Sequence, residues 1–401
     1  MKYLIIIICL FLPFLSFSND TLTSGSIGYY YNYSLNASSI GAKQIIKYYS
    51  SNYIENEFKD ELLDFNKNCR FNFSTHFDHA IFGFNFRNKK LSHLTFGLSD
   101  RSNTYGVFTN DALNIFLNGN KIFAGDTAIL NPVHLNNFNH KEVYTELTLN
   151  FKKNKIHHTI NIKPKLLFGN RYSFYKIDEA SIYTQQIGEF IDIILKGTFI
   201  SSDSLNSSAY ALNGFGLGTD IDYSLLINNS NILFSIKDFS FISWNKRTSI
   251  IEIDTSIYFE GILIEDITNL TDSIFANYTD SLTNFDLGSN NRHTFLLPTT
   301  IHLEYSYLLK KGKINKVYSG IIHRFNAYHK PLFYTGIQFS LEKSNFKTTL
   351  NFGGYNSFSI NNSYNVMFGN YALSLWANNI QSILFKKSNG LGFGIHLKKE
   401  F

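Results

Sequence analysis

The sequence predicts an all-β fold: a closed antiparallel transmembrane β-barrel of about 14 strands, within a range of about 12 to 16, with short helical inserts. Three observations lead to this prediction. The chain opens with an apolar leader, apolar residues then recur at every second position in many stretches, and the chain ends in a phenylalanine that is in phase with its last predicted strand.

Residues 1–18 have the pattern of a secretory signal peptide. Lys2 precedes an apolar run over residues 4–15, and small residues follow up to Ser18. A membrane-spanning helix needs roughly 20 apolar residues, so this run of about 12 is too short to anchor the chain. We therefore expect cleavage near Ser18 and a single outer-membrane β-barrel domain over residues 19–401.

The composition limits the classes of function. The net charge is +5 and the basic residues are scattered, which argues against a nucleic-acid-binding surface. Only Cys69 remains after the leader, so no disulfide can form within the exported chain. The 39 Phe and 25 Tyr suit strands and interfacial belts, although codon bias in an AT-rich genome gives the same enrichment.

Apolar residues alternate with polar ones over strand-length segments. Residues 27–35 carry Ile27, Tyr29 and Tyr31 on one face, with Asn32 and Ser34 on the other. Strands that face lipid on one side and a lumen on the other show this pattern. Half-buried strands of a soluble sandwich show it too, so the direction of the apolar face decides between the two folds. Similar segments are residues 143–151, 251–259, 301–309 and 333–341.

Three stretches interrupt the alternation and are expected to be non-barrel inserts. They lie near residues 52–67, 109–140 and 262–292. The first and the third have apolar residues at helical spacing. We interpret them as ordinary loops, with a lumen plug or a cap over one mouth as the alternative.

The carboxyl end carries a candidate assembly signal. Phe393, Ile395 and Leu397 lie on one face of the last predicted strand, and Phe401 keeps the same phase. This arrangement resembles the signal that the barrel assembly machinery recognises in outer-membrane proteins. We therefore expect that machinery as a partner during biogenesis and outer-membrane lipid as the surrounding medium.

Several segments between about residues 95 and 300 carry a family resemblance. They are residues 96–101 with Phe108, 111–120 with Gly125, 165–169, 214–223, 235–244 and 297–298. In this order they resemble a Bacteroidota family of outer-membrane barrels of unknown function, DUF5723. The resemblance implies a barrel with wider kinship to fatty-acid-channel-like and secretion-associated barrels, and it implies no reaction.

Three pairs of charged residues are expected to face the lumen, because the members of each pair lie two positions apart on a predicted strand. The acidic pairs could contact a cation or a polar solute, and the lysines could attract anions. The ordinary interpretation is that they balance opposite charges on neighbouring strands. The pairs are Asp220 with Asp222, Glu252 with Asp254, and Lys163 with Lys165.

Other side chains suggest an interfacial role or no chemistry. Trp244 and Trp376 suit the aromatic belts at the membrane surface. His76 and Asp78 share a strand face while His79 points away, which argues against a metal site. No serine and histidine stand at a distinctive spacing. We expect no catalytic residue, cofactor or metal.

These observations favour a non-enzymatic outer-membrane barrel. It would pass a hydrophobic or small polar solute, or serve as a structural part of a surface or secretion assembly with partner proteins. Two alternatives remain: a secreted soluble β-sandwich adhesin and an outer-membrane lipid hydrolase.

Overall fold

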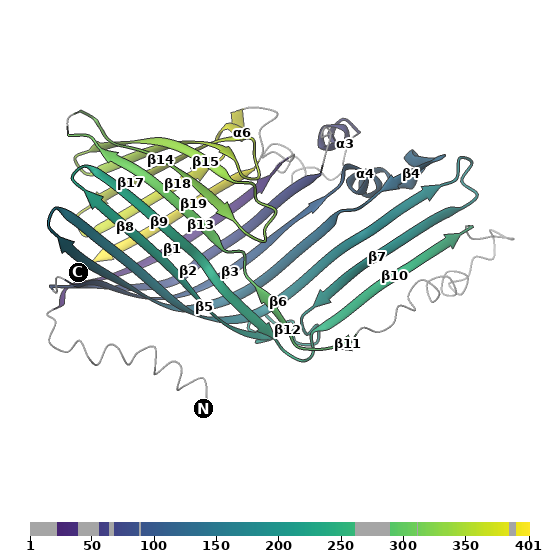
Figure 1. The fold of residues 1–401 in the computed structure, drawn as a ribbon, viewed down its shortest axis with the longest axis horizontal. Coiled ribbons are helices and arrows are strands. Elements are labelled where there is room, and N and C mark those ends of the chain that lie inside the picture. The colour runs from purple at the N-terminus through teal and green to yellow at the C-terminus, as the bar shows by residue number, and fades with distance from the viewer. Residues whose placement is uncertain are drawn as a thin grey trace.

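The computed structural model describes residues 22–38, 56–63, 68–87, 90–260, 289–310, 312–384 and 390–401. They form one antiparallel sheet that closes on itself (Figure 1). The first strand, β1 (Leu22–Ala37), pairs with both β2 (Cys69–Phe86) and the last strand, β19 (Leu391–Glu400). Tyr33 stands opposite Phe393 at this seam. The predicted closed barrel is therefore confirmed.

Fourteen strands make up the closed ring, as predicted. Each pairs with two ring neighbours, which satisfies the backbone polar groups that a membrane would leave without partners. Between β2 and β19 the ring order is β3 (Leu91–Phe108), β5 (Val133–Lys153), β6 (Ile156–Thr184), β8 (Gly214–Ile227), β9 (Ser230–Trp244), β13 (Thr300–Leu308), β14 (Ile314–Arg324), β15 (Leu332–Leu341), β16 (Ser344–Gly353), β17 (Phe358–Phe368) and β18 (Tyr371–Asn378).

The two ends of the ring differ in their connections. At the end that holds Phe401, pairs such as β5–β6 and β8–β9 are joined by two-residue turns. Asn154 and Asn228 adopt the left-handed conformation in these turns, with φ of 55° and 52°, which asparagine tolerates well. The other end carries the longer connections. We call them the short-turn end and the long-loop end; in outer-membrane barrels the short turns lie on the periplasmic side.

The wall of the ring is much taller on one side. Strands β13 to β19 have 8 to 11 residues, close to the roughly 9–11 needed to cross a bilayer. β6 has 29 residues, or about 95 Å at roughly 3.3 Å per residue. β8 pairs with its first half, and β7 (Ile191–Ser201) pairs with its second half. β10 (Ser249–Phe259) joins β7 outside the ring, so this projecting wall extends beyond the long-loop end (Figure 1).

The predicted inserts are found in part. The helix α3 (Asn56–Leu63) lies within 52–67, while the leader and most of 262–292 lie outside the described residues. The insert at 109–140 is shorter than predicted. It holds α4 (Asn110–Asn118), the 3-10 helix η1 (Asn120–Phe123) and β4 (Asp126–Ile129), but residues 133–140 belong to β5. The polar residues Asn136, Asn137 and Asn139 hid the strand by breaking the apolar alternation.

The apolar faces of the ring strands point outward. Leu303 is 46% exposed and Phe333 is 57% exposed, whereas the inward residues Ser306 and Asn351 are almost fully buried. A two-sheet sandwich would bury the apolar side chains between its layers. The closed ring with exposed apolar residues therefore excludes the soluble β-sandwich. In the described part of the chain, no helix has both the length and the apolar character needed to cross a bilayer.

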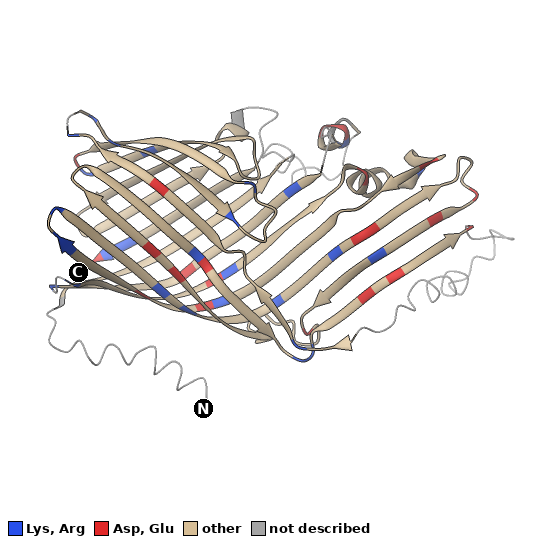
Figure 2. Ribbon diagram, viewed as in Figure 1, with Lys and Arg blue, Asp and Glu red and all other residues tan. Residues whose placement is uncertain are grey.

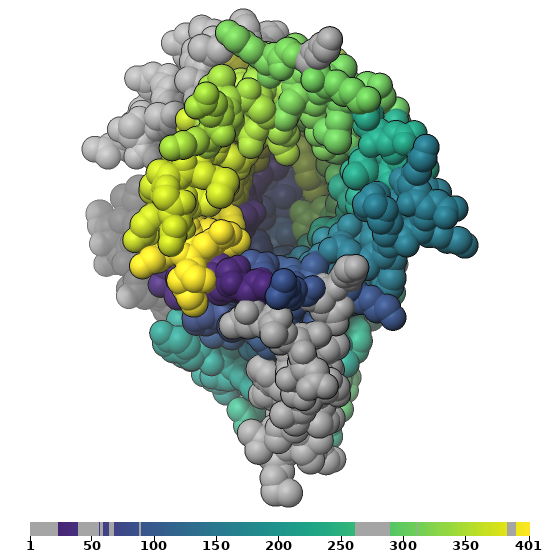
Figure 3. Space-filling model, turned by 90° about the vertical axis from the view of Figure 1, so that its left-hand side faces the viewer, coloured from purple at the N-terminus to yellow at the C-terminus, as the bar shows by residue number. Residues whose placement is uncertain are grey.

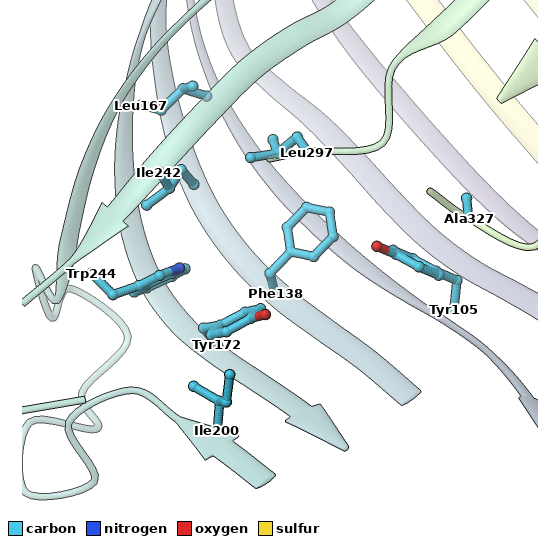
Figure 4. Packing of buried hydrophobic residues seen from close by; sticks show 9 residues of the cluster. All are labelled: Tyr105, Phe138, Leu167, Tyr172, Ile200, Ile242, Trp244, Leu297 and Ala327. Carbon is cyan, nitrogen blue, oxygen red and sulfur yellow. The ribbon is translucent and has the colours of Figure 1, made fainter. Parts of the chain in front are cut away.

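A hydrophobic cluster fills the ring where the projecting wall begins. Trp244 stacks on Tyr172 at 5.3 Å between ring centroids, and Phe138 packs close by (Figure 4). Leu297 follows β12 (His293–Leu296), and Ala327 lies in the connection from β14 to β15. These two connections fold inward and pack against the wall strands, which narrows the long-loop end.

Candidate lumen site

Five charged side chains from five ring strands form an ion network. Lys165 Nζ lies 2.7 Å from Asp220 Oδ1 and 2.8 Å from Asp238 Oδ1. Arg101 Nη1 lies 2.6 Å from Asp238 Oδ1, and Arg101 Nε lies 3.2 Å from Glu142 Oε2. Figure 2 shows the two signs of charge interleaved on these neighbouring strands. We call this set the lumen ion network.

The contact between Arg101 and Asp238 crosses the lumen. Arg101 lies on β3 and Asp238 on β9, and three strands separate β3 from β9 in the ring. Asp238 has a φ of 57°, a conformation that aspartate adopts more readily than most residues. It stands where β9 stops pairing with β13 at Lys237, before pairing with β12 resumes at Phe241. This irregularity brings the carboxylate into the lumen.

The buried members of the network are compensated. The side chains of Lys165 and Glu142 are 0% and 1% exposed. Burying an ion is costly unless it is paired and hydrogen-bonded. Glu142 also accepts from Ser99 Oγ at 3.3 Å and lies 3.0 Å from His140 Nε2. The amide of Asp238 donates to Asp220 Oδ1 at 2.7 Å. The network therefore fixes five strands around one point of the lumen.

The structure brings four of the six predicted lumen residues to this region. Lys165 and Asp220 belong to the network itself. Asp222 pairs with Lys237 at 2.6 Å, and Lys163 Nζ lies 3.5 Å from the centre of the Tyr144 ring. Both aspartates and Lys165 are thus paired with opposite charges on neighbouring strands, which was the ordinary interpretation.

Glu252 and Asp254 do not line the lumen. Both lie on β10, which is not a ring strand, and Asp254 pairs with Lys196 of β7 at 2.7 Å with both side chains exposed. The expectation was wrong because β10 has the same alternation as a ring strand but continues the projecting wall.

The two tryptophans are not at the membrane interface. Trp244 is fully buried in the hydrophobic cluster. Trp376 stacks on Tyr30 inside the ring, and its indole N–H donates to Asn32 Oδ1 at 2.8 Å. Both lie on the inward face of their strands. The indole N–H of Trp376 has a polar partner there, whereas the buried N–H of Trp244 has none among the described residues and its ring packs in the hydrophobic cluster. Gly394 leaves room for Trp376, because a Cβ at that position would overlap the indole.

Arg101, Glu142, Asp238 and Arg324 are the lumen residues that the sequence analysis missed as site candidates. Arg101 and Asp238 do lie within the segments that resemble the family, 96–101 and 235–244. Their position in these segments could have identified both residues as site candidates. The other two stand in ordinary strand sequence and only the ring brings them together.

A polar cavity of about 240 Å³ lies beside the network. Arg324 lines it from β14 and donates from Nη1 to Asn72 Oδ1 of β2 at 3.4 Å. β2 and β14 are opposite each other, with six ring strands between them in either direction. Side chains therefore bridge the full width of the lumen here. A second cavity of about 890 Å³ opens at the short-turn end, where Figure 3 shows the molecule hollowed.

The described residues include no group of three or more His, Cys, Asp and Glu side chains with the geometry to hold a metal. His76 contacts Asp78 at 3.2 Å, whereas His79 contacts Asp100 at 2.7 Å. None of the hydrogen bonds between described residues joins a serine hydroxyl to a histidine ring, the pair that a lipid hydrolase would need.

Comparisons with known proteins add the following. The model of DUF5723, a family of unknown function, matches residues 24–399. No curated protein matches the sequence. Solved structures that are similar include a mutant of the monoaromatic hydrocarbon channel TodX (7% identity, TM-score 0.42, covering 96% of this chain and 91% of that one). The Ralstonia pickettii toluene transporter TbuX is also similar, with 8% identity and a TM-score of 0.42 over 94% of this chain and 89% of that one. So is a Pseudomonas aeruginosa FadL homologue, with 6% identity and a TM-score of 0.39 over 96% of this chain and 91% of that one.

Proposed function

This chain belongs to the DUF5723 family, a family of unknown function, and we propose that it is an outer-membrane barrel that passes a small hydrophilic solute. One observation carries the proposal: the ring presents apolar residues outward and polar residues inward. Ser306, Asn351 and Ser359 are buried inward-facing examples on β13, β16 and β17. A path for a hydrophobic solute would need an apolar lining, which these strands do not provide.

Under this proposal, the described conformation is the closed state of the channel. The short-turn end is hollow, but the lumen ion network and the inward connections obstruct the far side. Tyr328 contacts His134 of the wall, and the Tyr355 hydroxyl donates to the Ala327 carbonyl at 2.5 Å. Passage therefore requires that the connection over residues 325–331 leave the wall.

Solute flux into liposomes tests this function. Wild-type protein refolded into vesicles should admit a neutral sugar slowly. Tyr328→Ser combined with Arg101→Ser should raise the rate several-fold, because both contacts across the lumen are lost. Leu205→Ser, in an exposed loop, is a matched control and should leave the rate unchanged. A folded double variant as impermeable as protein-free vesicles would rule out solute passage.

We also propose that the protein reaches the outer membrane through its signal peptide and the barrel assembly machinery. Phe401 supports this, because its amide and carbonyl pair with Gly25 of β1 and its ring is 70% exposed beside the seam. Deleting Phe401 should reduce the folded fraction several-fold, judged by heat-modifiable gel mobility, while leader cleavage continues. Normal folding of the truncated protein in cells would count against the assembly signal.

A second candidate is a structural role in a surface or secretion assembly. The projecting wall favours it, because among the described residues the positions 251–258 of β10 pair in the sheet only with β7. A strand edge can pair with another chain. A photocrosslinker at Ile253 should give one discrete adduct in cells, and Thr255→Pro should abolish it. If the crosslinker at Ile253 gives no adduct with or without Thr255→Pro, solute passage remains the better description.

A further inference from the structure

We infer that the 240 Å³ lumen cavity binds the carboxylate of a small hydroxylated solute, with Arg324 as the residue that holds the carboxylate. This inference rests on the proposed function and names its substrate class. The cavity lies between β1, β2 and β3 on one side and β13 and β14 on the other, so a bound molecule would sit on the axis of the lumen.

Arg324 is the cation in this cavity that lacks an acidic partner. Among the described residues no carboxylate lies within ion-pair distance of it, whereas Arg101 contacts both Glu142 and Asp238. Its side chain makes one long hydrogen bond, to Asn72, and its buried Nε has no hydrogen-bond partner. The residue is half-buried, and an anion that supplies an acceptor for this buried nitrogen would stabilise the guanidinium. A planar carboxylate matches the guanidinium fork with two parallel hydrogen bonds.

The rest of the lining indicates a hydroxylated body in place of an acyl chain. Ser74 and Thr300 offer hydroxyl groups from the inward face of their strands, and Asn32 and Asn103 offer amides. Apolar contact is confined to Phe138 with Leu297 and Pro298. A solute with several hydroxyl groups would replace the hydrogen bonds of water at these positions, whereas an alkyl chain would leave them unpaired.

Nearby acids limit the affinity. Asp238 also lines the cavity, and the network contains three carboxylates against two cations. Selection for the anion therefore comes from the hydrogen-bonding fork of Arg324 and not from a positive lumen. Weak binding of this kind suits a solute that must leave again.

Calorimetry on the full-length protein in detergent tests the inference with gluconate, glucose, acetate, octanoate and phosphate as probes. Gluconate should bind at least tenfold more tightly than glucose, which lacks the carboxylate, and more tightly than acetate, which lacks the hydroxyls. Octanoate binding as tightly as gluconate would overturn the hydroxylated class. Phosphate binding more tightly than gluconate would replace the carboxylate with a general oxyanion site.

Three variants make the test specific. Arg324→Gln should weaken gluconate binding at least tenfold, and Asn103→Asp should weaken it by placing a second carboxylate in the cavity without changing side-chain shape. Arg247→Gln is the matched control, because its side chain is 73% exposed in a loop and pairs with Asp203; it should bind like the wild type. Unchanged binding in folded Arg324→Gln and Asn103→Asp would overturn the site. Binding without flux would refute solute passage alone, and flux without binding would refute this site alone.

Discussion

The two sides of the ring are built differently. β13 to β19 have 8 to 11 residues, alternate almost strictly, and enclose a largely polar lining that includes the ion pair of Lys316 with Glu304. β2, β3, β5 and β6 have 18 to 29 residues and carry bulges, a buried ion network and the hydrophobic cluster. The short side is a plain membrane wall. The tall side holds most of the ion network and of the hydrophobic cluster, against which the inward connections from the short side pack.

This difference separates two structural tasks. A strand that only crosses the bilayer needs an apolar face outward and a polar face inward. A strand that continues past the bilayer must also pack against something, and here it packs against the inward connections at Leu297 and Ala327. We therefore expect substitutions on the tall side to act through buried charge and packing, and those on the short side to act through lipid contact.

The largest effect is expected at Lys165. Lys165→Met removes the cation that faces Asp220 and Asp238 and leaves uncompensated buried charge. Such a loss costs about 3–5 kcal/mol. Urea unfolding in lipid vesicles should show it. Lys196→Met, at the exposed pair with Asp254 on β7 and β10, is the control and should leave the midpoint unchanged. Equal stability of the two variants would remove the distinction between buried and exposed pairs.

On the short side, a charge that faces lipid should have the next largest effect. Tyr364 lies near the middle of β17 and is 40% exposed on the outward face. Tyr364→Arg should destabilise the barrel by about 2–4 kcal/mol, the range for an arginine at the membrane midplane.

The preceding residue provides the matched control. Ser363 pairs with Trp376, whose indole lies inside the ring, so Ser363→Arg places the same charge in the lumen. Its unfolding midpoint in vesicles should stay near that of the wild type. Equal losses for both variants would mean that β17 does not have one lipid face and one lumen face.

The alternation in the sequence located strands of the ring, while the prediction that the ring closes in a membrane also needed the apolar leader and the carboxyl-terminal phenylalanine. Each of residues 27–35, 301–309 and 333–341 matched a real ring strand, because lipid outside and polar groups inside impose the same period on every membrane strand. It could not tell that residues 251–259 form a strand outside the ring. A two-residue period reports which face is apolar, and it says nothing about which strand lies next to it.

The lumen site was predicted only in part, for a related reason. Lys165 and Asp220 were found because their charge and phase are visible in the sequence. Arg324 was missed, because its significance depends on the lack of a carboxylate within ion-pair distance among the described residues, and the sequence does not show which strands face it across the ring. Trp244 and Trp376 were misplaced because the preference of tryptophan for interfaces is weaker than the need of a buried indole N–H for a partner or of its ring for packing.

A pH-dependent effect is expected in the connection over residues 325–331. Burial, with Arg324 and His323 nearby, lowers the pKa of His329 to about 4. Its Nδ1 accepts from the Arg324 amide at 3.4 Å, which requires a neutral ring. Because the folded pKa lies below the unfolded value of about 6.5, this stabilisation is complete above pH 6.5 and is lost as the pH falls toward 4.

Hydrogen exchange of the amides in residues 325–331, corrected for intrinsic rates, measures this effect. Protection should decrease between pH 7 and pH 5 in the wild type. His329→Gln should show no such change, because it cannot be protonated in this range. A wild-type loop that stays equally protected at both values would mean that His329 does not hold the connection on the wall.

The smallest effect is expected where the short side meets the seam. Trp376→Phe removes the hydrogen bond to Asn32 but keeps an aromatic ring over Tyr30. Loss of one neutral hydrogen bond costs about 1 kcal/mol. A double-mutant cycle with Asn32→Ala, measured by unfolding in vesicles, should return a coupling energy of about that size. A coupling energy near zero would mean that ring stacking and the space beside Gly394 hold the indole in place. The hydrogen bond to Asn32 would then contribute nothing measurable to the stability of the short side.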